Sequence, residues 1–71
     1  MLKVDPNGTV LLYQCKEGHF WQRVSSPHPG VCLTLVEDNQ GNGGVGLPLY
    51  VTSDYFREHY TQVRVTEEGT L

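Results

Sequence analysis

The sequence predicts a small, mainly β fold, in which five strands close into a barrel with one short helical turn near residues 52–60. Short runs of β-branched and aromatic residues alternate with clusters of glycine, proline and asparagine, which is typical of strands joined by turns. Only one segment carries helix signals. A chain of 71 residues also forms a thin core, and closing its sheet would bury residues efficiently and leave no exposed edge.

The first three strands are expected at residues 9–15, 19–25 and 31–36. The turn between the first two contains Gly18, which tolerates the positive φ that tight hairpin turns require. Pro27 and Pro29 interrupt the chain before the third strand, because proline donates no ladder hydrogen bond. The following segment, residues 37–46, holds four glycines, and we expect it to be the most mobile internal loop.

A short strand at residues 47–51 contains Pro48, which places it at a sheet edge or makes it a strand start. Thr52 is expected to cap the helical turn, with Val51 and Phe56 packing together across its start. A last strand is expected at residues 62–66, where apolar and polar residues alternate. The whole chain, 1–71, is then one domain whose residues 1–8 and 67–71 are loose ends.

Within this order of elements, Gly46-Leu47 followed by Ser53-Asp54-Tyr55-Phe56 resembles the G-L … S-N-Y-V passage of Src-homology-3-like barrels. The resemblance covers residues 46–56, and the family's N-terminal A-L-Y-D-Y signature and tandem tryptophans are missing. The resemblance implies the barrel fold and the order of its elements, but it does not imply the peptide-binding specificity of true Src-homology-3 domains. An OB-type barrel is the alternative architecture.

The alternation of apolar residues along each expected strand, together with the helix start, predicts which side chains point inward. These are Leu12, Phe20, Val24, Leu33, Leu35, Leu49, Val51, Phe56, Val63 and Val65.

The charge pattern disfavours nucleic acid as a partner. Five Lys and Arg face eight Asp and Glu, and the basic residues are scattered singly, whereas binding to phosphate depends on clustered cations. No apolar run approaches the ~20 residues that span a bilayer. The N-terminus has no apolar stretch typical of a secretory signal, so we expect a cytoplasmic location without membrane contact.

Two cysteines and two histidines form the pattern Cys15-x3-His19 … His28-x3-Cys32. Two thiolates and two imidazoles are a ligand set for structural zinc. The spacing of three residues within each pair differs from the two residues usual in zinc knuckles. We therefore expect two free, reduced thiols and no metal or cofactor, and keep a zinc-stapled or nucleic-acid-binding accessory domain as the alternative function.

No nucleophile motif or paired carboxylates stand out, so we expect no enzymatic activity. Exposed tyrosine and tryptophan are typical of binding surfaces. Trp21 alternates against Phe20 and Val24, which predicts an outward ring. The expected function is protein binding without catalysis, as in small accessory proteins of phages or other mobile elements that modulate a partner. The sequence is also compatible with a homo-oligomer. The residues expected to contact the partner are Tyr13, Trp21, Arg23, Tyr50 and Tyr55.

Overall fold

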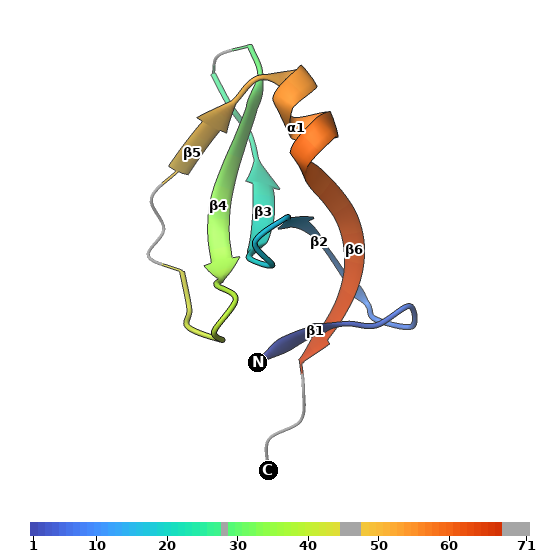
Figure 1. Cartoon of the computed structure of the whole chain (residues 1–71). Coiled ribbons are helices and arrows are strands. Elements are labelled where there is room, and N and C mark those ends of the chain that lie inside the picture. The colour runs from blue at the N-terminus through green and yellow to red at the C-terminus, as the bar shows by residue number, and fades with distance from the viewer. Residues whose placement is uncertain (28, 45–47, 68–71) are drawn as a thin grey trace.

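Six antiparallel strands and one helix make up the fold (Figure 1). The computed structural model describes residues 1–27, 29–44 and 48–67. The strands form one sheet in the order β1-β6-β2-β3-β4-β5. In chain order the elements are β1 (Leu2–Val4), β2 (Val10–Cys15), β3 (Phe20–Val24), β4 (Val31–Glu37), β5 (Pro48–Val51), α1 (Ser53–His59) and β6 (Tyr60–Glu67).

The sheet does not close, and this corrects the predicted five-stranded barrel. β1 and β5 are its two edges, at opposite ends of the strand order. The additional strand, β1, lies within the residues expected to be a loose end and pairs with the end of β6, with Lys3 opposite Thr66. β6 is eight residues long, so it reaches beyond the predicted 62–66 and offers β1 a partner.

Apolar clusters lie on both faces of this sheet. One consists of Leu12, Phe20 and Val65 with Leu2, Val36 and Val63 around them. The other consists of Val31, Leu33 and Phe56 with Tyr13, Trp21, Val51 and Tyr60 around them. Neighbouring residues of a strand point to opposite faces, and Phe20 and Trp21 accordingly belong to different clusters. Figure 1 shows α1 beside the ends of β3, β4 and β5 that are far from the N-terminus.

Most of the predicted inward residues are at least half-buried. Leu12, Phe20, Leu33, Phe56 and Val65 are buried, and Val24, Leu35, Val51 and Val63 are half-buried. Leu49 was predicted wrongly, since its side chain is 39% exposed. It lies on the edge strand β5, where the described chain provides no further strand to cover it. Cys15 and Cys32 are buried, as expected of free thiols, and Val31 is a further buried residue that was not among those predicted to point inward.

The start of α1 confirms the predicted cap. The Oγ1 atom of Thr52 accepts a hydrogen bond from the backbone N–H of Tyr55 at 3.1 Å. Phe56 is the buried residue of the helix. A helix of seven residues is unstable in isolation, so the cap and the burial of Phe56 hold it in place. Among the described residues, no helix is long and apolar enough to cross a membrane.

The cap gives a first testable prediction. Replacing Thr52 by Ala removes the acceptor for the Tyr55 N–H and should lower the free energy of unfolding by about 1 kcal/mol. Thr52→Ser keeps a hydroxyl and should stay close to the parent. Urea unfolding of the two variants measures the difference, and equal stabilities would show that the hydroxyl does not cap the helix.

Residues 37–46 were expected to form the most mobile internal loop. The first of them belongs to β4, and residues 45 and 46 lie outside the described residues. The described part of this segment is a hydrogen-bonded turn. The Asp38 carboxylate accepts from the backbone N–H groups of Gln40 and Asn42, each at 2.9 Å. The hydrogen bond from Asn42, followed by that from Gln40, lowers the pKa of Asp38 below its usual value.

Candidate functional site

A chain of aromatic contacts runs across the face of the sheet that α1 covers. Tyr13 meets Phe56 edge-on at 4.7 Å between ring centroids, and Phe56 stacks on Tyr60 at 5.5 Å. Tyr60 in turn meets the edge of Trp21 at 6.2 Å, and Trp21 meets His19 at 6.4 Å. Aromatic rings at these separations attract one another beyond the effect of burial. The five rings therefore form one aromatic cluster.

Trp21 does not present the exposed ring that was expected. It is half-buried against the cluster of Val31, Leu33 and Phe56. Its Nε1 atom is buried, and no acceptor lies within hydrogen-bond distance among the described residues. Trp21 does lie on the face opposite Phe20, as its alternation predicted, but that face carries a core of its own. The prediction of an exposed Trp21 assumed that only one face of the sheet is covered, and this was wrong.

Arg23 lies on the same face as Trp21. Its guanidinium carbon is 5.6 Å from the centroid of the Phe56 ring, a distance at which the positive charge is attracted to the ring. The side chain is exposed. Phe56 thus links Arg23 to Tyr13, two residues that were expected to share a binding surface.

Tyr55 and Tyr50 are the exposed aromatic residues of this region, at 48% and 55%. Tyr55 lies 4.1 Å from the ring of His59 and 6.3 Å from that of Tyr60, which joins it to the aromatic cluster. Tyr50 pairs with Cys32 in the register, so its side chain alternates to the other face. Four of the five expected contact residues therefore gather around Phe56 and Tyr60, and the side chain of Tyr50 lies on the opposite face of the sheet.

A groove of about 280 Å³ lies between β5 and α1. We call it the β5–α1 groove, and its lining consists of Leu49, Tyr50, Val51, Thr52, Tyr55 and Tyr60. None of these side chains carries a charge at neutral pH. Leu49 was expected in the core rather than in a groove, and Tyr60 was not among the expected contact residues. The spacing of Phe56 and Tyr60, four residues apart, was the available signal for the latter.

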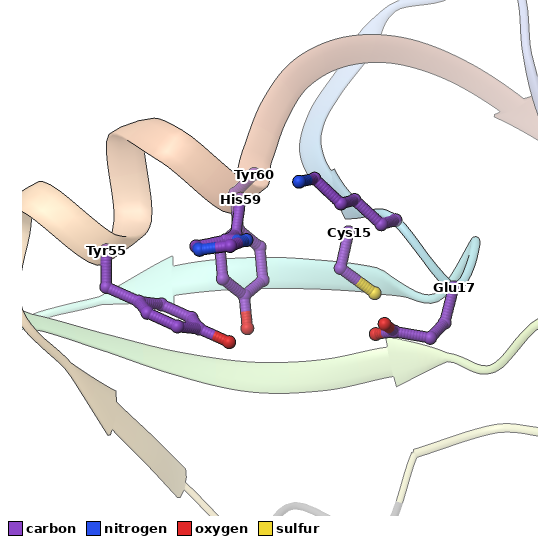
Figure 2. A pocket seen from close by; sticks show the side chains of 6 residues that line it. Cys15, Glu17, Tyr55, His59 and Tyr60 are labelled. Carbon is purple, nitrogen blue, oxygen red and sulfur yellow. The ribbon is translucent and has the colours of Figure 1, made fainter.

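A second, smaller cavity of about 40 Å³ lies beside Tyr55 and Tyr60. Figure 2 shows side chains from the end of α1 and from the end of β2 turned toward each other around it. Its lining is Cys15, Lys16, Glu17, Tyr55, His59 and Tyr60. Burial, followed by the neighbouring Cys15, raises the pKa of Tyr60, so its phenol stays protonated at neutral pH. The volume suits a water molecule rather than a substrate.

The residues of the zinc alternative lie apart where the structure describes them. Cys15 and Cys32 are both free and buried. Cys15 lies on the same face of β2 as Tyr13, whereas Cys32 lies on the opposite face of β4 from Leu33, and Tyr13 and Leu33 belong to the same cluster. Cys15 is two residues from Tyr13 and Cys32 one residue from Leu33, so the two thiols point to opposite faces. His19 accepts a hydrogen bond from Asn39, and His28 lies outside the described residues.

No family model, curated protein or solved structure matches the chain. The resemblance to Src-homology-3-like barrels is therefore unconfirmed, and residues 46 and 47, which carry part of it, lie outside the described residues. The chain is a small antiparallel β-sheet domain with one short helix.

Proposed function

We propose that the chain is a non-catalytic protein-binding domain that takes an extended segment of another protein into the β5–α1 groove. One observation carries this proposal: an uncharged groove, lined in part by Tyr55 and Tyr60, lies beside the edge strand β5. A segment added to such an edge gains main-chain hydrogen bonds, and its side chains gain specificity from adjacent pockets. The chain would act as a small accessory protein that modulates its partner.

The two edges of the sheet differ in how they are covered, which supports β5 as the binding edge. At β1, the Leu2 N–H donates to the Glu37 carboxylate at 2.7 Å, and the N-terminal ammonium pairs with Glu67 at 2.7 Å. Charged groups of this kind protect an edge from pairing. β5 ends the strand order on the other side, and in the described part of the chain no strand pairs with its outer edge.

The composition of the groove supports a protein as the partner. Leu49 and Tyr55 keep 39% and 48% of their surface exposed. Tyrosine brings a large contact area at a small entropic penalty, and it is enriched among the residues that dominate binding energies. Pro48 has no backbone donor, so a bound segment would form hydrogen bonds with the later residues of β5.

Selection from a random-peptide display library tests the proposal. We expect enriched peptides whose binding depends on Tyr55. Tyr55→Ala should weaken the binding of such a peptide by about 30-fold, the effect of losing a hot-spot side chain worth about 2 kcal/mol. Tyr55 is exposed, so the melting temperature should stay within a few degrees of the parent.

Leu11→Ala is the matched control, because Leu11 is 49% exposed on β2 and lies outside the groove. It should bind the selected peptides as the parent does. Peptides that bind the Tyr55→Ala variant as tightly as the parent, or a library that yields no sequence dependent on Tyr55, would contradict the proposed site.

A further inference from the structure

A histidine joins the turn between β2 and β3 to the segment that follows β4. Figure 1 shows these two parts of the chain side by side, at the end of β4. The Nδ1 atom of His19 accepts a hydrogen bond from the backbone N–H of Asn39 at 3.0 Å. The side-chain amide of Asn39 donates to the backbone oxygen of Glu17, also at 3.0 Å. Both bonds connect the same two turns.

The bond to the imidazole exists in one protonation state only. A ring nitrogen accepts a hydrogen bond when it carries no proton, and both ring nitrogens are donors in the imidazolium ion. The observed contact therefore requires the tautomer with its proton on Nε2. In the charged form, the Nδ1–H of His19 would face the N–H of Asn39, and two donors cannot bond to each other.

The charged neighbours offer the imidazolium another partner. Asp38 lies next to Asn39 on the segment after β4, and its carboxylate interacts electrostatically with His19. Lys16 and Glu17 lie on the same turn as His19 itself, and the uncharged Trp21 ring packs edge-on against it from β3. Because its hydrogen bonds to Asn42 and Gln40 lower the pKa of Asp38, this carboxylate stays negative while a histidine titrates.

We propose that His19 is a pH-dependent latch between the two turns. Neutral His19 holds the Asn39 N–H, and protonated His19 releases it and turns toward the Asp38 carboxylate. Histidine is the side chain that ordinarily changes charge between pH 5 and 8, so this is the interval over which the latch is tested. The inference rests on the His19–Asn39 contact and is independent of the function proposed for the β5–α1 groove.

The test follows the Asn39 amide and the His19 ring nitrogens by NMR from pH 8 to pH 5. At pH 8 we expect the Nε2–H tautomer. On acidification, the Asn39 amide shift should follow the same curve as the ring, and its hydrogen-exchange protection factor should fall about fivefold, the effect of losing one hydrogen bond of ordinary strength. An Nδ1–H tautomer at pH 8, or an Asn39 shift that does not follow the ring, would overturn the proposal without any substitution.

Two variants locate the effect. His19→Gln supplies an amide oxygen that accepts at every pH, so the Asn39 amide should stay bonded and lose its titration between pH 8 and 5. His59→Gln, at the end of α1, is the matched control and should leave the Asn39 titration unchanged. A His19→Gln variant in which Asn39 still titrates as in the parent would assign the pH dependence to another group and overturn the latch.

Discussion

Replacing Phe56 by Ala should lower the free energy of unfolding by about 3–5 kcal/mol. Phe56 is 8% exposed and packs with Val31 and Leu33. It also holds two ring contacts, to Tyr13 and Tyr60, and it is the residue through which α1 is anchored to the sheet. Proteins are stable by only about 5–15 kcal/mol, and a chain this small has a thin core, so urea denaturation should find the variant far less stable than the parent.

Arg57→Ala is the control for this substitution, since it changes the adjacent helix position. The Arg57 side chain is 75% exposed and pairs with Asp54 at 2.6 Å. Exposed ion pairs between neighbouring helix residues contribute about 0.3–0.5 kcal/mol. A Phe56→Ala variant no less stable than Arg57→Ala would mean that the cluster beneath α1 is not a core.

The second large effect is expected at Gly44. A Cβ atom added there would overlap the backbone carbonyl of Leu35 in β4, and the Gly44 N–H also bonds to the Val36 oxygen at 2.9 Å. Backbone cannot give way as a flexible side chain does. Gly44→Ala should therefore destabilise the fold by about 3 kcal/mol, the upper range for over-packing, and lower the melting temperature by more than about 10 °C.

Gly43 provides the comparison, because a Cβ atom there would meet nothing within 4 Å. Gly43→Ala should change stability by no more than about 0.5 kcal/mol. Equal melting temperatures of the two alanine variants in thermal unfolding would show that Gly44 does not lie close against the backbone of β4.

Local patterns predicted most of the elements. β2, β3, β4, β5 and α1 lie within a residue or two of their expected ranges, because turn residues and strand alternation are encoded next to each other in the chain. β1 was missed for the opposite reason. Its pairing joins Leu2 to Glu67, and no local signal in residues 1–8 records a partner at the far end of the chain.

The positions of the expected contact residues were predicted in part. Alternation correctly separated Trp21 from Phe20, but alternation says which residues share a face and not whether that face is covered. The burial of Trp21 depends on Phe56 of α1, which the chain brings back over the sheet. Leu49 was expected inside for the same reason. β5 is an edge strand, as Pro48 had indicated, and Leu49 lies beside the groove.

The Cys-His pattern shows another limit of spacing. Cys15 and Cys32 stand in a sequence arrangement that resembles a ligand set, yet the parity of their strands directs the two thiols to opposite faces. A metal site needs side chains that converge, and convergence depends on the register between strands rather than on distance along the chain.

The central claim, that β5 and its groove receive an extended segment of a partner, is tested most directly by amide hydrogen exchange with a library-selected peptide bound. The outward amides of β5, which do not bond to β4, should exchange at least about tenfold more slowly in the complex, because an added strand supplies their acceptors. The amides of β1 should be unchanged. Unaltered exchange along β5 together with new protection at β1, or at any other surface, would contradict the claim.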